Sequence, residues 1–184
     1  MKATGIVRRI DELGRVVIPK EIRRTLRIRE GDPLEIFTDR DGEVILKKYS
    51  PIGELSDFAK EYTESLHQAV GHISAIADKD TIIAVSGANK KELSEKAISE
   101  DIEGIMKRRE KILSHKGSDT RFYAITADED NPPYTAECIV PIYCEGDVIG
   151  SVIMLSRDEK VKMGTIELKL AETAAGFIGK QMEQ

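Results

Sequence analysis

Residues 6–26 read IVRRIDELGRVVIPKEIRRTL, and this stretch decides how the start of the chain folds. Two short runs rich in β-branched residues flank a turn at Leu13-Gly14, and Pro19 follows the second run. The stretch carries six Arg or Lys residues and three acidic ones, a net charge of +3, within a chain whose formal charge is −5. A basic patch on an acidic protein indicates a localised partner site, and nucleic acid is the first partner to consider.

The first fifty residues are expected to form a ββαββ unit. The predicted strands cover residues 4–10, 15–18, 34–38 and 43–49, where β-branched and aromatic side chains gather between glycine-containing turns. Pro19 fits the first position of a short helix over residues 20–26, because proline lacks only an N–H that this position leaves unpaired. A core this small, without cysteines or metal ligands, needs further stabilisation. We therefore expect an obligate homodimer whose strands interleave.

Charge divides the chain into two parts. Residues 1–50 hold 12 Lys and Arg against 9 Asp and Glu, and the remaining 134 residues hold 16 against 24. The excess charge therefore changes from +3 to −8 along the chain, which indicates two modules with different roles. We expect a DNA-binding domain over residues 1–50, a linker over residues 51–53 and a second domain over residues 54–184.

The remaining composition is that of a chain without a membrane segment. No apolar run approaches the roughly 18–20 residues that cross a bilayer, and no signal peptide is visible. Cys138 and Cys144 lie in one predicted strand, about 20 Å apart, which is too far for a disulfide. We expect no membrane partner and a cytoplasmic location.

The residues of the first fifty positions carry a family resemblance. The run GRVVIPKEIR at 14–23, followed by Gly31-Asp32 and by Leu34-Glu35-Ile36, resembles the AbrB-type swapped-hairpin DNA-binding family. The resemblance implies that two chains exchange hairpins to build one small β-barrel on double-stranded DNA. It also implies that DNA is met by the arginines at the matching positions, which are Arg8, Arg15, Arg23 and Arg24.

The residues themselves leave two alternatives open for these arginines. Neighbours in a regular strand point to opposite faces, so Arg8 and Arg9 cannot both face DNA, and only the family match selects Arg8. The arginines can also form a solvated face or pair with Asp11 and Glu21. If they meet DNA, a dimer doubles four positions into eight cationic contacts. Affinity should then fall by roughly 0.9 log unit per phosphate contact for each log unit of salt.

The second module has the element order of an α+β domain. Apolar residues recur at helical spacing over residues 54–70 and 163–177, and charged helical sequence covers 90–109. Strands are predicted over residues 73–77, 81–85, 136–143 and 148–155, with a further one over 121–126. The 73–85 hairpin and the two later strands resemble the GAF family of sensor domains. The element order predicts an antiparallel sheet flanked by helices. The resemblance implies a ligand-sensing or oligomerising domain in a nucleoid-associated protein, and it leaves open whether an unidentified small-molecule ligand binds. We place that ligand between the sheet and the helix that begins at Lys90, near the loop 128–134.

Together the two modules resemble a family of sporulation regulators from spore-forming bacteria. This implies a transcription regulator, both activator and repressor, assembled as a homotetramer through the C-terminal helices. An alternative is an AbrB-fold antitoxin that binds DNA and a protein partner. We expect no enzyme, no cofactor and no metal site, because His67, His72 and His115 lack metal-ligand spacing and no nucleophile or phosphate-binding motif is visible.

Overall fold

The computed structural model describes residues 6–54, 56–118, 121–130 and 133–183. The chain divides into two compact units, Met1–Tyr49 and Ser50–Gln184, called here the N-terminal and C-terminal units. Two sequence expectations fall partly outside the described residues, namely the first two positions of the strand predicted over 4–10 and the centre of the loop 128–134.

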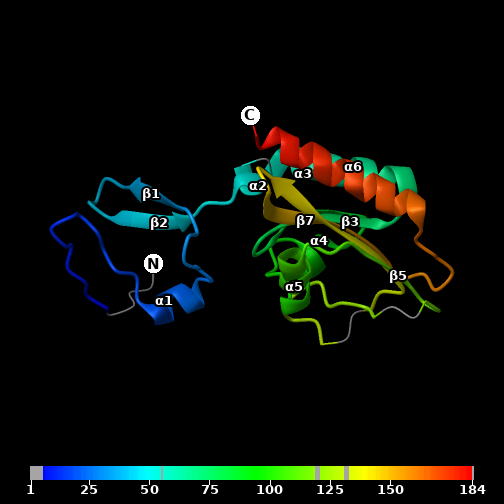
Figure 1. The fold of residues 1–184 in the computed structure, drawn as a ribbon, viewed down its shortest axis with the longest axis horizontal. Helices are drawn as coiled ribbons and strands as arrows, with labels where there is room; N and C mark the ends of the chain where they lie inside the picture. The colour runs from blue at the N-terminus through cyan, green and yellow to red at the C-terminus, as the bar shows by residue number, and fades with distance from the viewer. Residues whose placement is uncertain (1–5, 55, 119–120, 131–132, 184) are drawn as a thin grey trace. The chain divides into compact units, whose positions relative to one another are not determined.

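The N-terminal unit contains one helix and one hairpin (Figure 1). Helix α1 spans Lys20–Thr25 with Pro19 at its N-cap, and strands β1 (Leu34–Thr38) and β2 (Val44–Lys48) pair antiparallel. The helix and the last two predicted strands are therefore confirmed to within one or two residues. The first two predicted strands differ, because residues 6–18 contain a turn but no strand. A strand needs a ladder partner, and the described residues of one copy supply none for this segment.

The N-terminal unit also lacks an interior. None of residues 6–49 is buried, and twelve large hydrophobic side chains there are exposed, among them Val7 (86%), Leu13 (74%) and Val17 (71%). Both faces of the β1–β2 hairpin contribute, because the paired residues Ile36 and Leu46 lie on one face and the paired Phe37 and Ile45 lie on the other. A single copy of this unit therefore leaves in water most of the apolar surface that normally drives folding.

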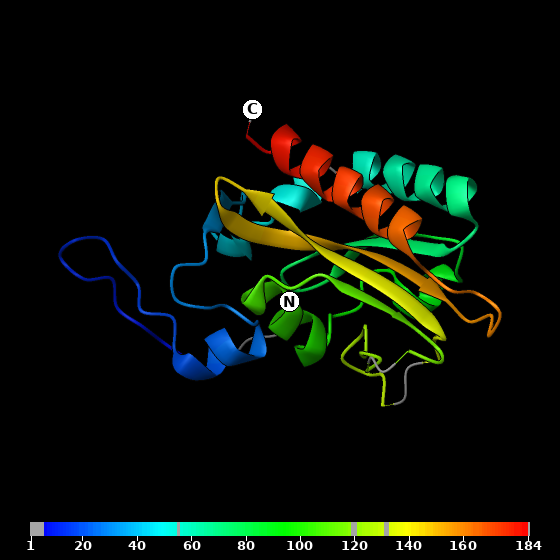
Figure 2. The ribbon, with the colours of Figure 1, turned by 45° about the vertical axis from the view of Figure 1, so that its right-hand side comes forward.

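The C-terminal unit is a five-stranded antiparallel sheet with helices on both faces (Figures 1 and 2). The strand order is β4-β3-β7-β6-β5. The strands span β3 (Ile73–Asp78), β4 (Ile82–Ser86), β5 (Ile112–His115), β6 (Ala136–Cys144) and β7 (Asp147–Ser156). Helices α3 (Ser56–Val70) and α6 (Thr165–Gln181) cover one face, while α4 (Lys90–Leu93) and α5 (Glu100–Arg108) lie on the other side.

Burial on both faces explains the nearly continuous apolar runs of β6 and β7. Val152 and Met154 point into the hydrophobic cluster beneath α3 and α6, while Ile153 and Leu155 point into the cluster on the α5 side. Successive strand residues alternate between faces, so a sheet covered on both sides needs apolar residues at every position. The helix-flanked antiparallel sheet expected from the sequence is confirmed.

Three local expectations differ from the structure. The residues 51–53 expected as a linker lie in α2 (Pro51–Glu54), and Ile52 is fully buried in the cluster beneath α3 and α6. The helix expected over 90–109 is interrupted at Glu95, whose φ of 62° is left-handed, and α5 begins afresh after its N-cap Ser99. Residues 121–126, expected as a strand, form an irregular segment instead, while strand β5 was not predicted from the sequence.

Candidate nucleic-acid interface

The N-terminal unit makes two hairpin-like turns. The first, at residues 11–15, lies between segments that form no strand and presents Arg15, and the second joins β1 to β2. Asp11 Oδ1 accepts hydrogen bonds from the backbone N–H groups of Leu13 (3.0 Å) and Arg15 (2.8 Å), and Gly14 takes a left-handed φ of 75°. Asp11 Oδ2 accepts from Arg15 Nε at 2.8 Å. The Arg15 amide, and then its guanidinium, hold the pKa of the Asp11 carboxyl below its usual range. Arg15 is thus one partner of an exposed ion pair rather than an isolated cation.

The second hairpin repeats this turn without the arginine. Asp39 Oδ1 accepts from the N–H groups of Asp41 (3.0 Å) and Glu43 (3.1 Å), and Gly42 has a φ of 81°. The backbone bonds match as well, since Asp39 N–H donates to the carbonyl of Glu43 just as Asp11 N–H donates to that of Arg15. The two tips therefore share one backbone design, but only the first carries a cation at the fifth position.

Helix α1 positions the other two arginines of the predicted interface. Arg24 is exposed, and Arg23 is half-buried with Nη1 3.4 Å from Glu30 Oε1. Both lie in the last turn, where a positive charge is favoured by the helix dipole. Arg23 Nε is buried and has no hydrogen-bond partner among the described residues. A buried donor left unsatisfied costs about 1–3 kcal/mol, so an acceptor from another molecule would relieve this cost.

Arg8 and Arg9 are both exposed in the chain, so exposure does not select between them. The Nη1 of Arg8 donates to the neighbouring Val7 carbonyl at 3.3 Å. Of the two acids that the sequence offered as partners, Asp11 does pair with Arg15, whereas Arg23 pairs with Glu30. All four candidate arginines belong to the N-terminal unit.

Sequence reasoning missed the structural use of Lys48. Its Nζ lies 3.0 Å from Asp32 Oδ2 and donates to the Arg27 carbonyl at 2.9 Å, while Asp32 also accepts from the Arg29 amide at 2.8 Å. These bonds tie the loop after α1 to the end of β2. The side chains of Lys48 and Asp32 are mostly buried, so this cation serves the fold; its spacing of sixteen residues from Asp32 gave no signal in the sequence.

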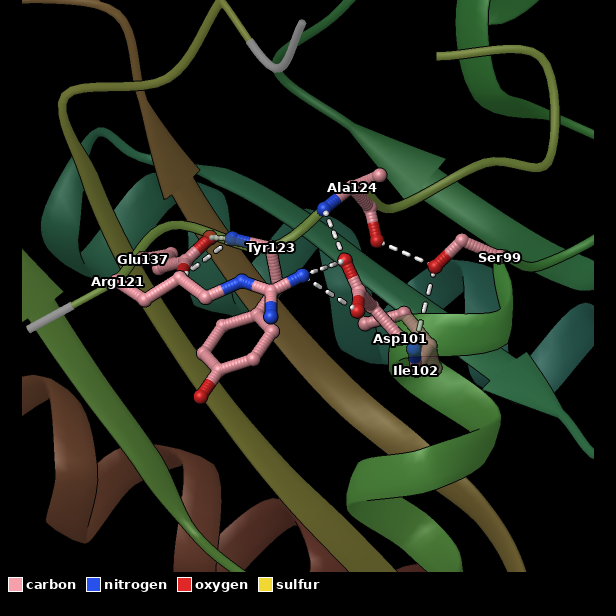
Figure 3. A network of polar contacts seen from close by, with 7 residues as sticks. All are labelled: Ser99, Asp101, Ile102, Arg121, Tyr123, Ala124 and Glu137. Carbon is pink, nitrogen blue, oxygen red and sulfur yellow. Dashed lines mark hydrogen bonds and ion pairs between the residues drawn. The ribbon is translucent and has the colours of Figure 1, made fainter. Parts of the chain in front are cut away.

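In the C-terminal unit, carboxylates hold one segment, residues 121–130, which we call the strap. Asp101 and Glu137 lie outside the strap (Figure 3), and Glu129 lies within it. Four successive backbone N–H groups of the strap donate to them. Tyr123 donates to Glu137 at 3.1 Å, Ala124 to Asp101 at 3.3 Å, and Ile125 and Thr126 to Glu129 at 2.7 and 3.3 Å. Carboxylates therefore replace the neighbouring strand that these amides would otherwise require.

Further bonds connect the strap to the start of α5. Ser99 caps α5 by accepting from the Ile102 amide and donates to the Ala124 carbonyl, and Arg121 pairs with Asp101 at 3.0 Å while lying over the Tyr123 ring. Figure 3 shows the Asp101 carboxylate between the Arg121 guanidinium and the Ala124 amide. The strap is thereby fixed to the start of α5.

Glu137 is the unusual member of this group. It sits fully buried in β6, and its two oxygens accept only from the Tyr123 amide among the contacts of the described residues. Burial raises the pKa of Glu137 to about 7; the Tyr123 bond opposes this rise, and the charges of Asp101 and Glu129 add to it. At neutral pH this side chain is therefore close to half protonated.

The position expected for a small-molecule ligand is filled by side chains. Ile98, Ile102 and Ile105 from the α5 region and Ile125 from the strap are all fully buried in the cluster on the α5 side of the sheet.

The remaining reactive side chains have structural surroundings. Burial raises the pKa of the Cys138 thiol to about 12, and both cysteines are free. His72 Nε2 lies 3.5 Å from Glu167 Oε1, where β3 begins beside the first turn of α6. Within the described residues, no cluster of three His, Cys, Asp or Glu side chains is arranged to bind a metal ion, and no helix is long and apolar enough to span a bilayer.

Two family models match the chain. Residues 54–183 match the model described as "Stage V sporulation protein T C-terminal, transcription factor", and residues 7–54 match "Antidote-toxin recognition MazE, bacterial antitoxin".

Individual relatives agree with this division. Stage V sporulation protein T of Bacillus subtilis is 59% identical over 186 residues, covering 100% of both chains. The transition state regulatory protein AbrB of the same organism is 62% identical over 63 residues, covering 31% of this chain and 65% of that protein. The GAF domain of an Acinetobacter phosphoenolpyruvate-protein phosphotransferase has a TM-score of 0.57 at 13% identity, covering 74% of this chain and 84% of that one. This last likeness concerns the fold alone.

Proposed function

The chain belongs to the stage V sporulation protein T family of transcription factors, and on that premise we propose that it binds double-stranded DNA in a sequence-dependent manner and both activates and represses sporulation genes. The observation that carries the proposal is the 59% identity over the full length. The antitoxin alternative is not favoured, because the antitoxin model covers residues 7–54 only. We assign no catalytic role, and we place the protein on the nucleoid in the cytoplasm.

The DNA-binding form is proposed to be a homodimer built through the N-terminal unit. The support is the absence of buried residues over 6–49 together with the exposed Val7, Leu13 and Val17. Fully burying one such side chain contributes about 1.5–3 kcal/mol, so a second copy that covers several of them supplies the missing core. In this dimer the segments 6–10 and 15–18 gain strand partners and complete the interleaved ββαββ barrel.

Contact with DNA is proposed through Arg8, Arg15, Arg23 and Arg24 of both chains. The N-terminal unit carries the chain's basic excess, and phosphate contacts with these arginines position the protein on the duplex. The domains proposed for these roles are residues 1–50 for DNA binding and 54–184 for regulation, joined at 51–53.

The regulatory domain is proposed to join two dimers into a homotetramer through α3 and α6. Phe58, Tyr62 and Phe177 form an aromatic cluster between these helices, with ring centroids 5.6–6.0 Å apart. Phe177 is 43% exposed and Ile166 on the same helix is 69% exposed, so apolar surface remains for a second copy. A small-molecule effector of this domain would act by displacing the strap, and a thermal-shift screen of cell metabolites tests for it. A screen without any shift assigns the domain a purely structural role.

The central test compares DNA binding by variants in which one arginine is replaced by alanine, either at a proposed contact or at a control position. Arg15→Ala and Arg23→Ala should each weaken binding to duplex DNA in a gel shift while leaving the dimer intact. Arg40→Ala removes the same charge from the exposed tip of the second hairpin and serves as the control. Wild-type affinity in the Arg15→Ala and Arg23→Ala proteins would remove those residues from the interface.

A further inference from the structure

Arg15 is held in a way that separates it from the other candidate arginines. Its Nε donates to Asp11 Oδ2 at 2.8 Å, which leaves the two terminal nitrogens, Nη1 and Nη2, for an outside acceptor. By contrast, Nη1 of Arg23 faces Glu30 and Nη1 of Arg8 donates to the chain's own backbone. Arg15 therefore presents the end of its guanidinium in a fixed direction.

The support for Arg15 is itself fixed. Asp11 Oδ1 accepts from two backbone amides, so the carboxylate cannot rotate without breaking the turn. All of these bonds lie within residues 11–15, and they do not depend on which molecule pairs with the flanking segments. The arrangement is thus a local property of the hairpin tip that dimer formation preserves.

The chemistry of a buttressed arginine favours a base over a phosphate. The Asp11–Arg15 pair has no net charge, so it attracts a phosphate less than a lone arginine does. A guanidinium that presents two parallel N–H groups matches the O6 and N7 acceptors on the major-groove edge of guanine.

We propose that Asp11 is a positioning residue that makes Arg15 a reader of guanine in the major groove. The inference rests on the proposed DNA-binding function and deepens it, because it assigns base readout to Arg15 and leaves phosphate contact to the other arginines.

The chain contains a matched control for Asp11. Asp39 makes the same turn with the same acceptor bonds but has Glu43, not arginine, at the fifth position. Asp11→Asn and Asp39→Asn therefore change the net charge equally, and each keeps an amide oxygen to accept the turn N–H bonds. Only Asp11→Asn removes the anionic partner of an arginine.

The experiment uses the full-length protein and a duplex that it enriches from a random DNA library. Affinities are measured for this duplex and for the same duplex with guanine replaced by 7-deazaguanine, which lacks the N7 acceptor but still pairs with cytosine. The wild type and Asp39→Asn should lose about five- to tenfold in affinity on the modified duplex, since a bidentate guanine contact is worth about 1–3 kcal/mol and 7-deazaguanine removes one of its two acceptors. Asp11→Asn and Arg15→Ala should lose most of this sensitivity. Circular dichroism and size-exclusion profiles equal to those of Asp39→Asn establish that Asp11→Asn is folded.

Several results would overturn the proposal while leaving DNA binding in place. These are wild-type indifference to 7-deazaguanine, full sensitivity in Asp11→Asn, or a library from which no sequence is enriched although DNA is retained. Failure of the wild type to retain any DNA would instead refute the proposed function itself.

Discussion

Replacing Glu137 by Gln should abolish a pH dependence that is built into the C-terminal unit. The wild-type carboxyl is fully buried and has a pKa of about 7, raised from 4.5. Its folded-state pKa lies above the unfolded one, so folding binds a proton between these values. The contribution of Glu137 to stability is therefore greatest at low pH and declines as the pH rises from about 4.5 to about 7.

The size of the effect follows from the pKa shift. About 2.5 pKa units at about 1.4 kcal/mol each give roughly 3 kcal/mol of destabilisation by the ionised Glu137 above pH 7. Glutamine keeps an oxygen to accept from the Tyr123 amide but cannot ionise. Its NH₂ group adds buried donors with their own cost, so the clear prediction concerns the pH dependence and not the absolute stability.

Two measurements report this effect. Urea unfolding followed by circular dichroism at pH 5 and pH 8 should show that Glu137→Gln gains about 2.5 kcal/mol relative to the wild type between these pH values, because a small part of the effect is already present at pH 5. Hydrogen exchange of a peptide spanning residues 121–130, corrected for intrinsic rates, should show that at pH 8 the strap opens more readily in the wild type than in Glu137→Gln. An equal stability difference between the two proteins at both pH values would refute the assignment of a raised pKa to Glu137.

Three further predictions concern other parts of the chain. Gly179→Ala should destabilise the protein by about 1–3 kcal/mol, because an added Cβ would lie 2.0 Å from the Tyr143 carbonyl oxygen. At Gly176 on the same helix an added Cβ meets open space, so Gly176→Ala should stabilise the protein by about 0.5–1 kcal/mol. Thermal melts of the two variants and the wild type measure both effects. Glu172→Gln should lower the melting temperature at pH 7, because two lysines hold the pKa of Glu172 at about 2. The difference in melting temperature between the variant and the wild type should shrink as the pH falls from about 4.5 towards 2. A difference that stays the same over this range would contradict the ion pairing. Val17→Asp should convert the N-terminal dimer to monomers in analytical ultracentrifugation of the full chain at low concentration, and unaltered assembly would place Val17 outside the interface.

Local sequence signals determined most secondary structure of this protein. Alternating and β-branched runs placed β1 at Leu34–Thr38, and the Asp39–Gly42 turn joined it to β2, because turn chemistry acts over a few neighbouring residues. The arginines at 8, 15, 23 and 24 were identified as candidates by family resemblance, while the sequence alone left their pairing with acids open.

Contacts between distant residues were decided only by the tertiary structure. In the sequence, Glu137 is one polar residue in an apolar strand. The fold buries it against the Tyr123 amide and near Asp101, which precedes Glu137 by thirty-six positions. The strap could not be recognised in the sequence, since its amides pair with carboxylates rather than with a strand of matching pattern. Asp101 and Glu137 come from two other segments, and Glu129 comes from the strap itself. In the stretch 6–26, the local sequence determined the turn, the helix and the charge, because these depend on near neighbours. The strands proposed for it depend on a second copy of the chain.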